Sequence, residues 1–289
     1  MGLSVRVEKG KLPATAQRFL TEAAQPSLLW QAIPEDVLLA IASRFDVASF
    51  IEATAAFLEP QADQAIRTGL ESALGPFFGP PEALSTFKSG VGPDWGFWAF
   101  GPVREPKERN WFPQLVLAIK LRDGEEGARS GDLLLDGLHA LAAFVRLSNS
   151  QIMMGKEKDG QVEIRYLTGP GKTLPAGLRP AYATKGGYLI VAGNPETIRR
   201  FQPPTGPLKP ADENPLIRIS LKAWRDYLSE HRSELAGYFA EAGQSSPAVM
   251  LNVLDEVTKN LKGLDALEVV LKSQQDQASL MIRLKTQPK

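Results

Sequence analysis

The string at positions 168–173, Thr-Gly-Pro-Gly-Lys-Thr, ends like the phosphate-binding loop of nucleotide hydrolases. Such a loop also needs a glycine five positions before Gly171, where the backbone curls around phosphate, and a helix that begins at the lysine. Here Tyr166 occupies the first place, and Leu-Pro-Ala-Gly follows Thr173 instead of a helix. The string therefore predicts a turn between strands, and we expect no bound cofactor.

Two serine patterns are also incomplete. Ser85 and Lys88 have the spacing at which a lysine can deprotonate a serine on one helical turn, as in penicillin-recognising enzymes. The residues that follow, Ser-Gly-Val-Gly-Pro, are expected to break any helix at once, and Leu174 after Lys172-Thr173 leaves no Lys-Thr-Gly strand. In residues 127–131 the serine is displaced by one position from the Gly-x-Ser-x-Gly elbow of hydrolases. Support for serine hydrolysis is therefore weak.

Residues that could ligate metals or act as acids and bases are dispersed. The chain has two histidines and no cysteine, which excludes disulfides, cysteine-ligated zinc and thiol catalysis. His231, with Glu234 as a possible partner, and His139 each lie in a predicted helix. Because a metal site needs three or more converging ligands, we interpret both as structural and expect no metal. Sequence alone cannot pair the aspartates into an acid and a base; they are Asp46, Asp94, Asp123, Asp132, Asp136 and Asp255.

An aromatic concentration at positions 77–112, interleaved with glycine and proline, is the unusual feature that remains. Because side chains alternate along a strand, Trp95 and Trp98 point to opposite faces, so one face can present a ring to a sugar, a peptide or an apolar ligand. The alternative is a central strand buried on both faces. The loop at 102–109 is either a solvated hairpin tip or the rim of a site. The predicted ligand-binding residues are Trp95, Trp98, Phe100, Trp111, Phe112, Arg104 and Arg109.

Composition is that of an ordinary globular protein. The 289 residues include 33 Lys and Arg and 33 Asp and Glu, so there is no bulk field to attract nucleic acid or an anionic membrane. We expect no nucleic-acid partner. No run approaches the roughly 20 apolar residues of a membrane span, and the first residues lack the features of a signal peptide.

Two segments, 36–122 and 214–286, share the order strand, helix, helix, strand, strand. In the second, an apolar run at 216–221 precedes helical periodicity to Phe239, a second helix at 249–261, and strands at 267–271 and 278–284. In the first, a strand at 37–41 precedes helices at 47–58 and 61–74, a long loop, and strands at 95–100 and 114–121. The pattern predicts an α+β fold of repeated units, with mainly antiparallel sheets that pack against helices.

The region between these segments predicts a helix at 131–147 and two hairpins. The first joins 152–154 to 161–167, and the second joins 180–184 to 188–192 through Lys-Gly-Gly. Asn194 with Pro195 is a helix start signal. The proline-rich stretch 202–215 then marks a lobe boundary. We predict a first lobe at 1–205, which opens with a strand and helix like the tail of an earlier unit, and a second repeat copy at 206–289.

The element order, the stretch Gly-Tyr-Leu-Ile-Val-Ala-Gly-Asn-Pro-Glu that begins at Gly187, and the closing strand pair resemble a bacterial family of envelope-associated proteins found in planctomycete-type genomes. This family has no assigned activity. The resemblance implies a repeated α+β fold and export to the periplasm or cell exterior behind a signal segment upstream of this chain. It offers no catalytic residue to transfer.

Two functions from different classes remain. The first is a non-catalytic extracytoplasmic binding or scaffold protein for a protein, glycan or apolar ligand, with a groove or apolar patch near Trp95, Trp98 or Trp111. The alternative is a carboxylate-dependent hydrolase that acts on a glycan or peptide, which needs two acidic side chains roughly 5 to 9 Å apart in one cleft.

Overall fold

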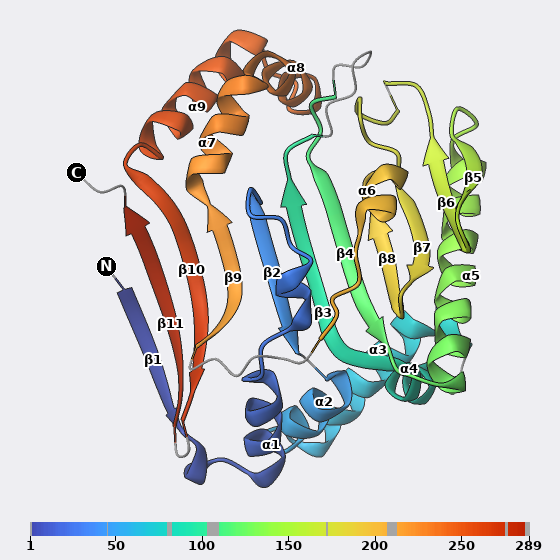
Figure 1. The fold of residues 1–289 in the computed structure, drawn as a ribbon, viewed down its shortest axis with the longest axis vertical. Coiled ribbons are helices and arrows are strands. Elements are labelled where there is room, and N and C mark those ends of the chain that lie inside the picture. Colours follow the sequence, from blue (N-terminus) through green and yellow to red (C-terminus); the bar gives the residue numbers. More distant parts are fainter. Residues whose placement is uncertain are drawn as a thin grey trace.

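The computed structural model describes residues 2–44, 46–79, 83–102, 110–171, 173–206, 213–274 and 277–286. The strands among these residues form one antiparallel sheet, in the order β1-β11-β10-β9-β2-β3-β4-β8-β7-β6-β5 (Figure 1). The strands are β1 Gly2–Glu8, β2 Leu39–Arg44, β3 Val91–Phe100, β4 Gln114–Leu121, β5 Met153–Asp159, β6 Val162–Thr168, β7 Ala181–Lys185, β8 Tyr188–Ala192, β9 Asn214–Ser220, β10 Leu264–Ser273 and β11 Gln277–Thr286. The predicted α+β class is confirmed.

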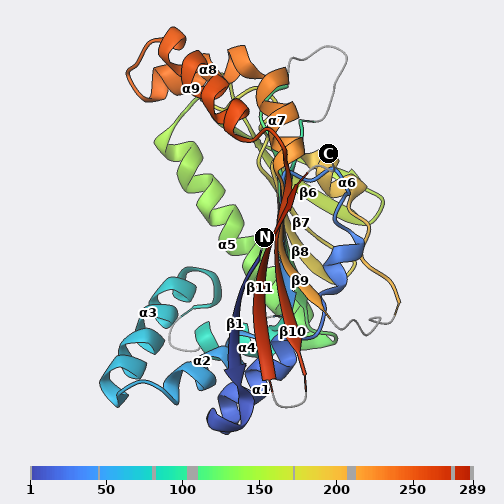
Figure 2. The same ribbon diagram turned by 90° about the vertical axis from the view of Figure 1, so that its left-hand side faces the viewer.

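Helices cover both faces of this sheet unequally (Figure 2). Most of them lie on one face, and the short helix α6 and the 3-10 turn η2 lie on the other. The α-helices are α1 Ala14–Ala23, α2 Val47–Ala55, α3 Pro60–Phe78, α4 Ala83–Gly90, α5 Glu125–Ser148, α6 Pro195–Arg200, α7 Leu221–Glu230, α8 Arg232–Ala242 and α9 Pro247–Asn260; the 3-10 turns are η1 Lys9–Lys11 and η2 Leu28–Gln31. Among the described residues, no helix combines the length and apolarity that crossing a bilayer requires.

The two faces of the sheet carry different cores, because successive side chains along a strand such as β4 point to opposite faces. Val116 and Ala118 belong to the core beneath η2 and α6, together with Trp98 and Ile190. Leu115 packs toward α7 to α9 on the opposite face, and neighbouring cores on that side lie under α3, α4 and α5. A single sheet therefore supports two separate apolar layers.

The predicted hairpins of the middle region are confirmed. Strands β7 and β8 pair through Gly186 and Gly187, whose φ angles of 57° and 75° favour glycine. Strands β5 and β6 also pair around a tight turn at Gly160, and β5 is longer than the predicted segment 152–154. At 168–173, Pro170 accepts from the amides of Thr173 and Leu174, which is the turn predicted there.

Helix α4 was not predicted. We expected a long loop after residue 74 and a broken helix at Ser85 and Lys88, but α3 continues to Phe78 and α4 spans Ala83–Gly90. The Phe87 ring packs edge-on against Phe78 at 5.7 Å, which adds tertiary stabilisation that local propensity lacks. A Cβ on Gly90 would lie 1.7 Å from the Ser130 hydroxyl oxygen on α5, so this glycine permits a close helix contact rather than only ending a helix.

A second difference concerns the helix expected to run from residue 221 to 239. The structure has two helices there, α7 and α8, which meet at His231 with φ −107° and ψ 24°. Segments β2 to β4 and β9 to β11 therefore each contain a strand, three helices and two strands, where we expected two helices in each. That the two segments are repeated units remains a prediction.

The predicted lobe boundary at residues 205 and 206 lies within a continuous sheet. Strand β9 pairs with β2 at Leu39↔Ile219 and Ile41↔Ile217, so the sheet passes from one predicted lobe to the other without interruption. The Trp30 indole nitrogen also donates to the Pro215 carbonyl oxygen at 2.8 Å. The elements on either side of the boundary therefore share a hydrogen-bonded surface.

Candidate functional site

The tryptophans of β3 have different surroundings. Trp98 is 2 % exposed and stacks on Phe201, with 6.2 Å between ring centroids. Trp95 is half-buried, and its indole nitrogen is buried with no hydrogen-bond partner among the described residues. Phe100, at the end of the strand, is half-buried beside the Trp98 core. Of these three predicted site residues, Trp98 and Phe100 line a common cleft.

The remaining predicted residues lie elsewhere. Trp111 packs against the α7 to α9 layer, 5.2 Å from the Tyr238 ring, and its carbonyl oxygen accepts from the Tyr227 hydroxyl at 2.8 Å. Phe112 contacts Trp111 edge-on at 5.8 Å. Arg104 and Arg109 lie outside the described residues. The five predicted residues that the structure describes are therefore not brought together in one site.

The cleft shared by Trp98 and Phe100 lies where β3 and β9 end, and α6, the segment 32–38 and α7 supply its lining from the two faces of the sheet. It has a volume of about 860 Å³. Apolar side chains of β3, β4 and the end of α6 line it, including Val116 and Phe201. This volume is within the range of small-molecule sites, which are mostly apolar with a few polar groups at fixed positions. The cleft is therefore the candidate functional site.

One side of α7 supplies polar groups to the cleft. Lys222, Asp226 and Glu230 recur at intervals of four, so they share a face of the helix. The Lys222 ammonium donates to the Asp226 carboxylate at 3.0 Å. Ser220 caps the helix by accepting from the Ala223 amide at 3.0 Å, which fixes where this face begins. His231, where α7 ends, also lines the cleft.

Tyr227 closes the cleft toward the sheet. Its side chain is 6 % exposed, and its ring lies 5.1 Å from the His231 ring. Burial raises the pKa of the Tyr227 hydroxyl, which therefore remains protonated and donates to the Trp111 carbonyl. This hydroxyl acts as a structural donor at neutral pH.

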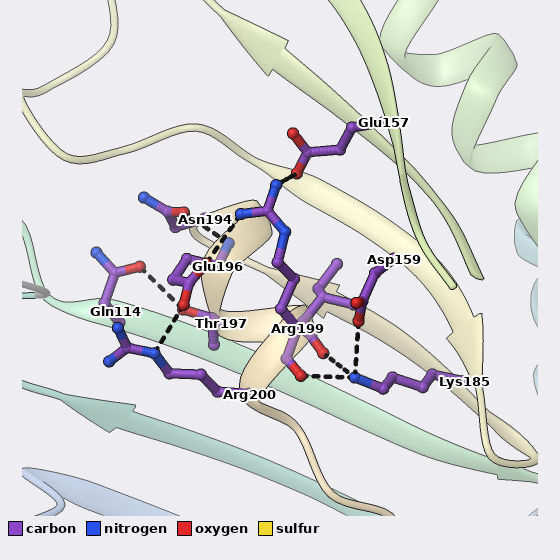
Figure 3. Close-up of polar contacts among 10 residues, drawn as sticks. Gln114, Glu157, Asp159, Lys185, Asn194, Glu196, Thr197, Arg199 and Arg200 are labelled. Atoms are coloured by element: carbon purple, nitrogen blue, oxygen red, sulfur yellow. Dashed lines mark hydrogen bonds and ion pairs between the residues drawn. The ribbon is translucent and has the colours of Figure 1, made fainter. Parts of the chain in front are cut away.

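Helix α6 positions the opposite wall and is held at both ends (Figure 3). At its start, the Asn194 side chain accepts from the Glu196 amide at 2.9 Å. At its end, the Lys185 ammonium donates to the carbonyl oxygens of Ile198 and Arg199 at 3.0 and 2.6 Å, and pairs with Asp159 at 3.3 Å. A cation at this end also complements the helix dipole. The short helix is therefore fixed to the β5–β8 sheet region.

Side-chain contacts along α6 extend this anchoring to the cleft wall. The Thr197 hydroxyl donates to the side-chain oxygen of Gln114, which is fully buried on β4, at 3.3 Å. Arg199 pairs with Glu157 on β5 at 2.6 Å, and Arg200 donates through Nε to Glu196 at 2.9 Å (Figure 3). Thr197 and Arg200 both line the cleft, so the anchoring contacts place two of its polar groups.

The lining of the cleft has an excess of negative charge. Its carboxylates outnumber its permanent cations by four to two. Both cations are paired, Lys222 with Asp226 and Arg200 with Glu196. The four carboxylates are Glu35, Asp36, Asp226 and Glu230. The wall at 35–36 is exposed, so these charges meet a ligand that enters from solvent.

Most of the cleft residues were not anticipated. The interval of four that links Lys222, Asp226 and Glu230 was a usable signal for one polar helix face. Nothing local connects this face to Arg200 or to the segment 32–38, because their proximity depends on the pairing of β9 with β2. Trp98 and Phe100, which the aromatic signal selected, are among the residues that line the cleft.

The described residues contain no group of three or more His, Asp or Glu side chains arranged to hold a metal ion. Comparisons with known proteins found no matching family model, no matching curated protein and no matching solved structure.

Proposed function

We propose that this chain is a non-catalytic binding protein that holds a small organic cation with an apolar body in the cleft between α6 and α7. The observation that carries the proposal is the combination of an aromatic lining with an excess of carboxylates. An ammonium group gains from nearby carboxylates and from aromatic faces, while the apolar body gains by leaving water. A repeated architecture and an extracytoplasmic location, as the family resemblance implies, belong to the same proposal.

The direct test is binding of matched probes measured by calorimetry and thermal shift. We expect phenethylamine and benzyltrimethylammonium to bind, and phenethyl alcohol and phenylacetate to bind at least about tenfold more weakly, because charge-assisted contacts contribute about 1.5–3 kcal/mol. A ligand at 100 times its Kd stabilises the fold by about 2.7 kcal/mol, which a thermal shift detects. Equal affinity for the cation and the anion would exclude the proposed charge selection.

Two variants locate the binding. A Cβ on Gly101 meets no atom within 4 Å, so Gly101→Leu adds bulk to the cleft without a backbone clash and should abolish binding. Gly237→Leu is the matched control, because Gly237 is equally unobstructed but lies on α8 away from the cleft. Glu35→Gln with Asp36→Asn should weaken amine binding by about tenfold, whereas Glu256→Gln on exposed α9 should not. Binding that survives Gly101→Leu would place the ligand elsewhere.

A second candidate function is the carboxylate-dependent hydrolase of a glycan or peptide. It is favoured by the presence of Asp226 and Glu230 on one face of α7 in a single cleft. Release of reducing sugar or peptide from a mixed substrate panel, lost in both Asp226→Asn and Glu230→Gln, would support it. No turnover by wild-type protein across that panel would exclude it. Periplasmic fractionation of the tagged native protein tests the location independently.

A further inference from the structure

A row of polar side chains crosses the sheet at the end of β3 opposite to the cleft. Arg44 on β2 is the register partner of Asp94 on β3, and Lys120 on β4 is the register partner of Tyr188 on β8. By alternation these side chains share the face that carries Ala42, Ala118 and Ile190 beneath η2. Together with Leu28 and Arg122 they line a pocket of about 320 Å³.

Asp94 forms the floor of this pocket. It is 6 % exposed, and its Oδ1 atom makes no hydrogen bond within the described part of the chain, while Oδ2 accepts from the Tyr188 hydroxyl at 3.4 Å. Burial raises its pKa, and four neighbours oppose this rise: the Ser27 hydroxyl, the Arg44 charge, the Leu28 backbone amide and the Tyr188 hydroxyl. A buried carboxylate with unused acceptor capacity is costly for the fold. A ligand that supplies a donor would satisfy the Oδ1 atom.

The Lys120 side chain is held in place by close packing against two glycines. A Cβ on Gly92 would lie 3.1 Å from the Lys120 Cγ, and a Cβ on Gly187 would lie 2.9 Å from its Nζ, so the side chain occupies a slot between two glycines. Its ammonium lies 5.2 Å from the Tyr188 ring centroid and 3.5 Å from the Asp123 carboxylate. The Asp123 side chain is 98 % exposed, so this pair is screened by water. The lysine is therefore positioned while its charge stays available to a ligand.

Two arginines complete the basic wall. Arg44 uses Nη1 to donate to Gln25 at 2.8 Å. Arg122 donates through Nε to the Lys88 carbonyl oxygen and through Nη2 to Asp46, both at 3.1 Å. These contacts orient each guanidinium and leave further N–H groups on both. The three cations of the pocket exceed its two carboxylates, Asp94 and Asp123.

We infer that this pocket binds a small 2-hydroxy carboxylate, with its carboxylate held by Arg44, Lys120 and Arg122 and its hydroxyl donating to Asp94. The basic wall selects the anion, and the buried acceptor selects the adjacent hydroxyl. The pocket volume restricts the ligand to a few carbon atoms. This site is separate from the cleft and favours the opposite charge.

Calorimetric titration of the full chain with lactate, propionate and phosphate tests the inference. We expect lactate to bind about tenfold or more tightly than propionate, because propionate leaves the buried acceptor unsatisfied. Lys120→Met and Arg44→Gln should each weaken lactate binding by about tenfold. Arg218→Gln is the control, because Arg218 is also a sheet arginine but lies over Trp30, outside the pocket. Equal affinities for lactate and propionate, or a preference for phosphate, would overturn the inference.

Asp94→Asn separates recognition from a structural role. The amide retains the size of the carboxylate, so we expect the variant to fold and to lose most of the preference for lactate over propionate. A variant that folds, as judged by its far-UV circular dichroism, and retains that preference would contradict the assignment. Gly101→Leu, which fills the cleft, should leave lactate binding unchanged. The test of amine binding in the cleft and the test of lactate binding in this pocket can therefore give a negative result independently of each other.

Discussion

Asp94 is the residue whose chemistry most clearly conflicts with stability. Burial raises its pKa above the ordinary value of 3.8, so the folded state binds a proton more readily than the unfolded state does. The contribution to stability from its protonation is fully present below the unfolded pKa and is lost as pH rises through the folded pKa. The charged form of Asp94 is therefore disfavoured in the folded interior relative to the unfolded chain, as expected where function opposes stability.

We predict that Asp94→Asn raises the free energy of unfolding at pH 7 relative to wild type. The difference should shrink as the pH falls. The carboxyl of folded wild-type protein, whose pKa lies above 3.8, then takes up a proton and loses its charge. Urea unfolding of both proteins from pH 4 to pH 8 measures this difference. A difference that does not change with pH would mean that the change in stability does not come from the charge of Asp94.

From the sequence, site residues could be selected only where the signal lay among neighbouring positions of the chain. Trp98 and Phe100 could be selected because aromatic residues cluster in the chain. Asp94 was noted only as one scattered aspartate, since its neighbours Lys120 and Tyr188 meet it through the register of β3, β4 and β8. Register across non-consecutive strands depends on the whole sheet.

At the scale of elements, the stability of helix α6 depends more on contacts from the strands beside it than on the helix propensity of its own sequence. Six residues are too few for a stable isolated helix, so its caps and Lys185 must hold it. We predict that Lys185→Met lowers the free energy of unfolding by about 1–3 kcal/mol, because two helix carbonyls and Asp159 lose a charged donor. It should also weaken amine binding, since Arg200 and Thr197 line the cleft from this helix.

Thermal denaturation and calorimetry of Lys185→Met measure both effects. Lys158→Met is the matched control, because Lys158 is an exposed lysine on β5 and makes no hydrogen bond or ion pair with α6 among the described residues. If both variants lose stability equally, the prediction that Lys185 anchors α6 is wrong.

Elements specified by local signals were predicted, and those specified by tertiary contacts were not. The β7–β8 hairpin follows from alternating side chains around Gly186 and Gly187, and α6 from its cap Asn194. Helix α4 has a poor local sequence, yet Phe87 on Phe78 and Gly90 on Ser130 stabilise it. The break at His231 likewise appears only in the folded chain, where α7 and α8 pack on one layer through Tyr227 and Leu235.

At the scale of the whole molecule, the question is whether residues 1–205 and 206–289 behave as separate lobes. The contacts across this boundary are buried. Asn214 is 1 % exposed and donates to the carbonyl oxygens of Ala23 and Gln25 at 3.2 and 2.9 Å. Leu38 and Ala99 share a core with Tyr227 and Leu235. Separating the two parts would expose this core and leave buried polar groups without partners.

We therefore predict that the chain unfolds in one cooperative transition, despite its proline-rich boundary. Hydrogen exchange followed by mass spectrometry at increasing urea would test this, with peptides from β3 and β4 compared with peptides from β10 and β11. Both sets should lose protection at the same urea concentration, because β2 and β9 hold them in one sheet. Earlier loss in β10 and β11 would instead establish residues 206–289 as a separate folding unit. In that case a ligand bound between α6 and α7 would contact both units, and it should bring the two transitions closer together.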